Sequence, residues 1–131
     1  MFTLSQIKET HQSIVKTGAD FPRYVQAIVQ LGVTSYETFV SDGHTVYYGK
    51  DGSTQQTEAK YAALKIISTA DNETFRSLLK LHQEGKRDFM TFCNDCAATG
   101  VEKWVVNTAD MTCRYFDLAG NEMLVEQIPT V

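Results

Sequence analysis

Residues 88–120 read DFMTFCNDCAATGVEKWVVNTADMTCRYFDLAG, and residues 20–52 read DFPRYVQAIVQLGVTSYETFVSDGHTVYYGKDG. A constant shift of 68 places residues 20–58 on residues 88–126 without a gap, and eight of the 39 pairs are identical. Typical residue frequencies give about two identities by chance. The identities favour turns and helix ends: Asp20/Asp88, Phe21/Phe89, Gly32/Gly100, Val33/Val101, Asp42/Asp110, Tyr47/Tyr115, Gly52/Gly120 and Glu58/Glu126. The sequence therefore predicts a tandem duplication.

Each half of the chain predicts two helices followed by three strands. Helical apolar spacing, β-branched runs and turn residues mark these elements. In the first half we expect helices over 4–17 and from Asp20 to Gly32, and strands over 33–40, 45–49 and 54–58. In the second half we expect helices over 72–84 and 89–98, and strands over 101–107, 112–118 and 123–128.

The helix ends are marked by capping residues. Thr3 and Gln6 have the spacing of a capping box, and Gly18 is expected to stop the first helix. Three aspartates, Asp20, Asp71 and Asp88, are expected to cap the other helices. Gly32 and Gly100 follow helical patterns, so we expect a left-handed backbone at both.

Residues 60–68 are ambiguous. A short apolar run does not distinguish helix from strand by its period. The β-branched residues Ile66 and Ile67, followed by Ser68 and Thr69, are poor helix formers, so a strand is favoured here.

The predicted fold is α+β, a single domain over residues 1–131 built from repeats at about 3–68 and 71–128. Short turns between strands predict antiparallel pairing within each half. The halves are expected to bury their apolar surfaces against each other around a pseudo-twofold axis. Whether the two sheets merge edge to edge or pack face to face is left open.

Composition excludes several classes of protein. The net charge is −4 and 43% of the residues are hydrophobic. A nucleic-acid-binding face needs concentrated positive charge, which is lacking here, and no apolar run reaches the roughly 20 residues of a membrane span. The first residues lack a basic head and an apolar signal core, and three cysteines make an odd number. We therefore expect a cytoplasmic protein without nucleic-acid or membrane partners.

Cys93 and Cys96 form a Cys-x-x-Cys pair. A metal site would need further ligands, for which Cys113 and His82 are the candidates. The repeat places Cys93 on Val25 and Cys96 on Ile28, which are core positions, so a buried structural role is favoured. No metal and no cofactor are expected, and the thiol or metal reading is kept as the alternative.

His11 and His82 each lie on the apolar face of a predicted helix. One reading is a pair of packed histidines whose ring nitrogens find protein partners. The other is a pair of titratable groups facing a common pocket. We expect any ligand cleft to lie along the seam between helices and sheet. It would touch His11 or His82 and one of the aromatic residues of the strands, namely Tyr36, Tyr47, Trp104 or Tyr115.

Several motifs resemble one known family: residues 18–22, 96–106, 111–117, 120–121 and 125–129. The chain resembles the YbcV/YdfO-like proteins of bacteria and prophages, the domain of unknown function 1398, of which some members are labelled "phage envelope protein". The resemblance spans nearly the whole chain and matches residues 53–69 least well. It implies a small α+β protein and supplies no catalytic residues.

The sequence is therefore consistent with two functions. The first is a non-enzymatic binding or interaction protein of bacterial or prophage origin, with self-association left open. The alternative is a small thiol- or metal-dependent protein or enzyme that uses Cys93, Cys96, Cys113 and His82. The sequence identifies no substrate, ligand or partner.

Overall fold

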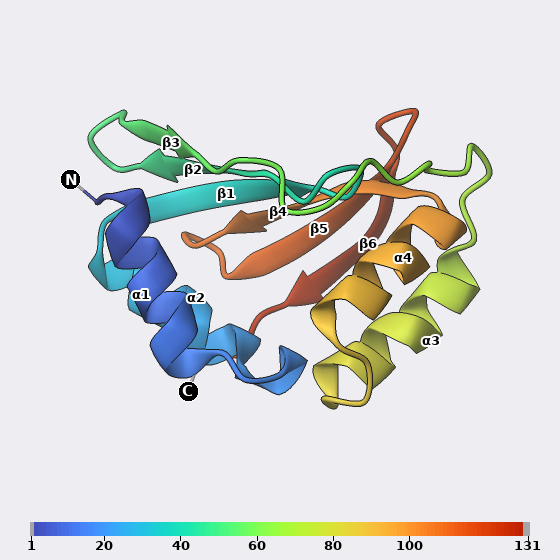
Figure 1. The fold of residues 1–131 in the computed structure, drawn as a ribbon, viewed down its shortest axis with the longest axis horizontal. Helices are drawn as coiled ribbons and strands as arrows, with labels where there is room; N and C mark the ends of the chain where they lie inside the picture. The colour runs from blue at the N-terminus through green and yellow to red at the C-terminus, as the bar shows by residue number, and fades with distance from the viewer. Residues whose placement is uncertain (1, 130–131) are drawn as a thin grey trace.

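The computed structural model describes residues 2–129, which form an α+β fold. The helices lie in two pairs against one face of a six-stranded antiparallel sheet (Figure 1). The first half contains α1 (Leu4–Ile14), the 3-10 turn η1 (Gly18–Asp20), α2 (Phe21–Gln30), β1 (Val33–Phe39), β2 (Thr45–Gly49) and β3 (Thr54–Gln56). The second half contains α3 (Asn72–Gln83), α4 (Phe89–Thr99), β4 (Val101–Asn107), β5 (Thr112–Asp117) and β6 (Glu122–Gln127). Among the described residues, no helix is long and apolar enough to cross a membrane.

Side-chain caps begin three of the four α-helices. Thr3 and Gln6 form the predicted capping box at α1, and Asp71 and Asp88 accept hydrogen bonds from backbone amides at the starts of α3 and α4. Asp20 precedes α2 but makes no cap bond to it. Its carboxylate instead accepts hydrogen bonds from the backbone amides of Lys16 and Thr17, which lie shortly after the end of the first helix.

The first helix ends earlier than the sequence predicts. It stops at Ile14, where Val15 takes an extended backbone, and Gly18 belongs to η1. The carboxylate of Asp20 explains this early end, because it binds the amides of Lys16 and Thr17 and so stabilises a turn in place of another helical turn. The predicted helix over 4–17 with a stop at Gly18 is therefore wrong at its C-terminal end.

The two three-stranded units merge edge to edge. The strand order is β3-β2-β1-β4-β5-β6, so β1 and β4 form the central antiparallel pair. Glu37 lies opposite Val105 at the centre of this pair, and Phe39 opposite Lys103. Glu37 and Val105 are themselves related by the shift of 68, as a twofold axis through this pair requires. The question of merging or stacking is settled in favour of one continuous sheet.

The strand registers of the two halves follow the same shift. Tyr36 pairs with Tyr47, and Trp104 pairs with Tyr115. The register slips between Val33 and Ser35 in one half and between Val101 and Lys103 in the other, again 68 residues apart. The outer strands differ, because only the β5–β6 pair has a further irregularity between Tyr115 and Phe116. The element order fits the repeat, and the duplication of the chain itself stays a prediction.

The connecting segment, residues 57–71, is neither strand nor helix, so the strand favoured over 60–68 is wrong. Its backbone amides donate to carbonyls of unrelated elements, among them Lys60 to Asp42, Leu64 to Ser41 and Ile67 to Ala97. The Tyr61 hydroxyl donates to the carbonyl of Val40 at 2.6 Å. These hydrogen bonds to several different elements hold the segment in place without any strand pairing. Figure 1 shows it, in green, running along the sheet from β3 to α3.

The sheet face turned away from the helices carries polar contacts across the midline. Lys103 pairs with Glu37 at 3.2 Å, and Glu37 also accepts from the Tyr48 hydroxyl at 2.8 Å. The Lys103 ammonium lies over the rings of Phe39 and Phe116. This network spans β2, β1, β4 and β5, so it ties the two halves together on the open face.

Gly32 and Gly100 end α2 and α4 with the expected positive φ angles of 98° and 91°. A Cβ at Gly100 would lie 2.9 Å from the Cα of Ala70, whereas a Cβ at Gly32 would meet nothing within 4 Å. Replacing either glycine by alanine should cost about 1 kcal/mol in the free energy of unfolding for the left-handed backbone. We predict that Gly100→Ala costs about 1–3 kcal/mol more than Gly32→Ala, because the backbone at Ala70 must move to make room for the new Cβ. If urea denaturation shows that the two variants lose the same free energy of unfolding, the close packing at Gly100 is contradicted.

Candidate functional site

The four aromatic residues predicted from the strands gather on the helix-facing side of the sheet. Tyr36 and Tyr47 are cross-strand neighbours, as are Trp104 and Tyr115. Each is less than a tenth exposed. Their rings contact one another within each half, with centroids 5.2 Å apart for the tyrosine pair of the first half and 6.2 Å apart for Trp104 and Tyr115. They form an aromatic floor beneath the helices.

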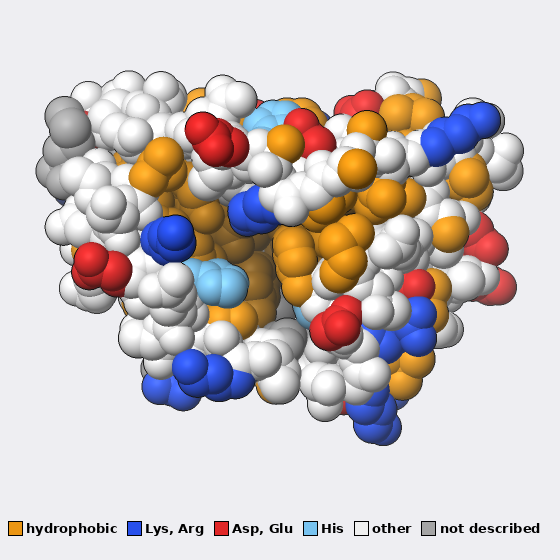
Figure 2. Space-filling view, in the orientation of Figure 1, with side chains coloured by type: hydrophobic (Ala, Val, Ile, Leu, Met, Phe, Trp, Pro, Cys, Tyr) orange, Lys and Arg blue, Asp and Glu red, His pale blue; other side chains and the backbone are white. Residues whose placement is uncertain are grey.

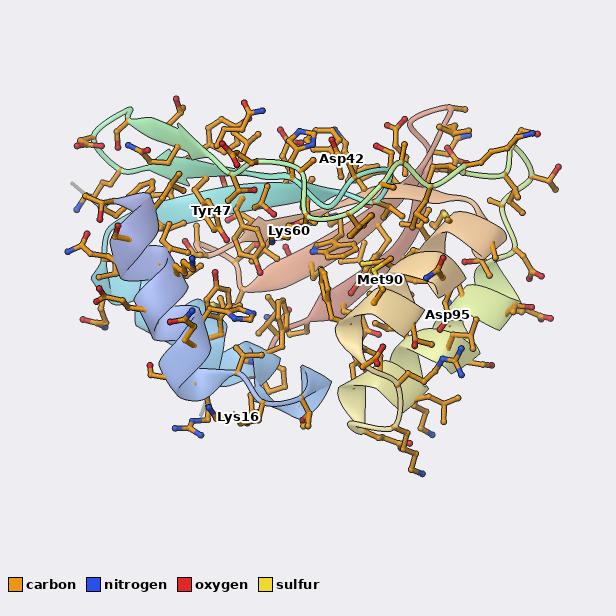
Figure 3. All side chains as sticks on the ribbon, viewed as in Figure 1. Lys16, Asp42, Tyr47, Lys60, Met90 and Asp95 are labelled. Carbon is orange, nitrogen blue, oxygen red and sulfur yellow. The ribbon has the colours of Figure 1, made fainter. Side chains whose placement is uncertain are left out.

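A hollow lies above this floor between the two helix pairs. Figure 2 shows it as an apolar depression, with the α1–α2 pair on its left and α4 on its right. Figure 3 shows that Lys60 extends from the connecting segment over the hollow, with Met90 on the α4 side. We call this depression the midline hollow, because it lies over the boundary between the halves.

The wall on the α1–α2 side is built around Tyr24. The His11 ring packs edge-on against Tyr24, with centroids 5.4 Å apart. The Tyr24 hydroxyl lies 3.0 Å from that of Tyr47, which joins this wall to the floor. Burial raises the pKa of both tyrosines, so both hydroxyls stay protonated at neutral pH. They can therefore donate and accept hydrogen bonds but carry no charge.

The opposite wall begins at the N-terminus of α4. Phe89 is 42% exposed and its ring meets Trp104 edge-on, with centroids 6.5 Å apart. Met90 is also partly exposed. An apolar ring left this open beside a buried tryptophan offers surface that a ligand can cover.

Lys60 supplies a cationic group at the rim, and His11 supplies a group that becomes cationic when it is protonated. The Lys60 ammonium lies 5.8 Å from the centroid of the Phe89 ring, within reach of a cation–π contact. Both side chains keep exposed surface and are partly buried. This burial lowers the pKa of Lys60. Burial, and secondly the nearby charge of Lys60, lower the pKa of His11.

His82 occupies a different environment from His11. Its Nδ1 lies 2.8 Å from the backbone carbonyl oxygen of Arg87, and its ring stacks on Phe92 at 4.3 Å. These contacts join α3, the loop after it and α4, and they give one ring nitrogen of the histidine a partner within the protein. The structure therefore brings His11 together with Lys60 at the hollow, and gives His82 a packing role within the α3–α4 pair.

The three cysteines are all buried, free and on the inside of the fold. Burial raises the pKa of Cys93 and Cys96, and that of Cys113 to about 12. Thiols in this state are poor nucleophiles and poor metal ligands. Within residues 2–129, no group of three or more His, Cys, Asp or Glu side chains is arranged to hold a metal ion.

Two shallow depressions lie outside the hollow. One, of about 460 Å³, is lined by Phe2, Leu31, Gly32, Lys50 and Asp51. The other, of about 400 Å³, lies along the outer side of α1 beside Leu31. Neither contains a residue predicted for the site. The first has an apolar lining around Phe2 and Leu31 with two charged residues, and the second is lined mostly by polar side chains of α1.

Lys60 and Phe89 were missed as site residues by the sequence analysis. Lys60 lies in the connecting segment, where neither the repeat nor a periodic pattern predicts a side-chain position. Phe89 had a usable signal, because it is the residue directly after the Asp88 cap and matches Phe21 in the repeat. A large ring in the first turn, ahead of the buried stripe of its helix, indicates a ring that remains partly exposed.

A model of one protein family matches most of this chain. It is described as "Protein of unknown function (DUF1398)" and covers residues 8–127, which include both walls of the hollow and all six strands. No curated protein matches the chain.

The buried state of the thiols predicts their reactivity. We expect Cys93, Cys96 and Cys113 to react negligibly with a disulfide reagent such as Ellman's reagent in native buffer, and all three to react in denaturant. One thiol that reacts within seconds in the native protein would instead support the thiol-dependent alternative.

The hydroxyl pair of Tyr24 and Tyr47 can be tested by a double-mutant cycle. Tyr24→Phe should destabilise the fold by about 1–2 kcal/mol, because the buried hydroxyl of Tyr47 loses its partner. Tyr47→Phe should do the same. The double variant should lose less than the sum in urea denaturation. Additive losses would mean that the two hydroxyls do not bond in solution.

Proposed function

The chain belongs to DUF1398, a family of proteins of unknown function, and we propose from its site that it is a non-enzymatic protein that binds a small apolar molecule. The ligand site is the midline hollow. The observation that carries this proposal is the exposed Phe89 ring, which lies beside buried Trp104 and under the Lys60 ammonium, together with the apolar depression between the helix pairs (Figure 2). Ligand pockets commonly combine such apolar linings with a few polar groups.

The chemistry of the site supports binding over catalysis. The three thiols are buried and protonated, and His82 is engaged by a backbone carbonyl. The tyrosine hydroxyls at the hollow are likewise neutral. These groups can shape and orient a ligand, but none of them is prepared as a nucleophile.

The cellular setting is part of the same proposal. We place the protein in the cytoplasm of a bacterium or in a prophage context, from its odd cysteine count and the family resemblance. Self-association is compatible with the open sheet face, and light scattering of the purified protein measures it directly.

Binding can be followed through Trp104, the single tryptophan of the sequence. N-phenyl-1-naphthylamine, a neutral probe that brightens in apolar surroundings, should bind saturably and accept excitation energy from Trp104. Phe89→Ala should weaken binding about 2- to 10-fold, the size expected for one aromatic contact.

The control variant is Leu118→Ala. Leu118 is 45% exposed, close to Phe89 in exposure, but lies after β5 away from the hollow. Its replacement should leave probe affinity unchanged. Absence of saturable binding, or equal weakening by both variants, would refute the midline hollow as the binding site.

A further inference from the structure

Lys60 is distinguished by its position at the midline hollow, where its ammonium lies over the ring of Phe89. Lys103, Arg87, Arg114 and Lys86 each pair with a carboxylate. Lys60 forms no ion pair within the described chain, and its ammonium faces an aromatic ring instead. A cation held at an apolar hollow without a counter-charge leaves a position that an anion can fill.

Two titratable groups lie near the Lys60 ammonium. His11 approaches from α1, and Cys93 lies on α4. Burial disfavours the charged form of both His11 and Lys60, and the charge of Lys60 further disfavours protonation of His11. The rim therefore has one cation, Lys60, and a histidine that becomes a second cation when it is protonated, and neither forms an ion pair within residues 2–129.

We propose that the ligand of the midline hollow is an apolar anion, a carboxylate or sulfonate, whose charged group lies between Lys60 and His11. Its apolar body would pack against Phe89 and the aromatic floor. This inference rests on the proposed function, since it names the chemical class of the molecule that the hollow binds. A charged hydrogen bond to Lys60 supplies the selectivity over neutral molecules of the same shape.

The test compares two probes that differ mainly in charge. Naphthalene-1-sulfonate is an anion across the accessible pH range, and naphthalene-1-sulfonamide is its neutral counterpart at neutral pH. Each competes with N-phenyl-1-naphthylamine for the hollow. We expect the sulfonate to displace that probe at an about tenfold lower concentration than the sulfonamide, as one charge-assisted bond predicts.

Two lysine variants isolate the contribution of Lys60. Lys60→Met should abolish the preference for the sulfonate while the sulfonamide binds as before. Lys65→Met is the matched control, because it removes one exposed positive charge from the same segment. It should retain the preference. Since both probes are measured on each variant, a general loss of folded protein cannot imitate the expected change.

The pH dependence tests the second cation. A bound anion raises the pKa of His11 from its lowered value in the free protein, so sulfonate affinity should increase as pH falls from 7 toward 5. Lys60 stays protonated throughout this range, and the buried Cys93 and Tyr61 stay neutral. His11→Gln should flatten the profile. A flat profile in the wild-type protein would remove His11 from the anion site.

The two proposals fail in different ways. If N-phenyl-1-naphthylamine does not bind at all, the proposed function is wrong. If it binds but the sulfonate and sulfonamide compete equally, only the anion inference is overturned. Equal loss of preference in Lys60→Met and Lys65→Met would also overturn it, because the effect would then be one of overall charge.

Discussion

The antiparallel pairing of β1 with β4 is the contact on which the rest of this structure depends. Each half alone is a three-stranded sheet with two helices, and such a unit leaves a long strand edge exposed to other chains. Joining the two edges satisfies their backbone groups and makes one six-stranded sheet. On the open face, the Glu37–Lys103 ion pair and its aromatic neighbours reinforce the same seam.

The midline hollow follows from this way of joining the halves. Each helix pair packs on the strands of its own half, so the boundary between β1 and β4 is covered from both sides but not bridged by a helix (Figure 1). The connecting segment crosses the same boundary because it must lead from one half to the other. It thereby places Lys60 over the Phe89 ring of the second half. A cation and an apolar hollow are brought together by connectivity, without any catalytic motif.

The sequence predicted much of the fold because its signals are local. Three helices are capped by side-chain bonds to amides a few residues away, from Thr3, Asp71 and Asp88. The left-handed backbone that favours glycine occurs at Gly32 and Gly100. The merging of the sheets could not be predicted, because it depends on which edges meet across residues far apart in sequence. Asp20 illustrates a local failure, since its carboxylate binds the preceding turn instead of the helix that follows.

The site was predictable only where it lies on regular elements. The strand aromatics and His11 have positions set by periodicity and by the repeat, whereas Lys60 lies in a segment whose path depends on carbonyls of Asp42, Ser41 and Ala97.

The most direct measurement of the central claim is the location of bound ligand by amide NMR. On titration with naphthalene-1-sulfonate, the largest shift changes should cluster at Lys60, His11, Phe89 and Trp104. Clustering around Phe2, Leu31 and Lys50, or on the open face around Lys103, would contradict a ligand site at the midline.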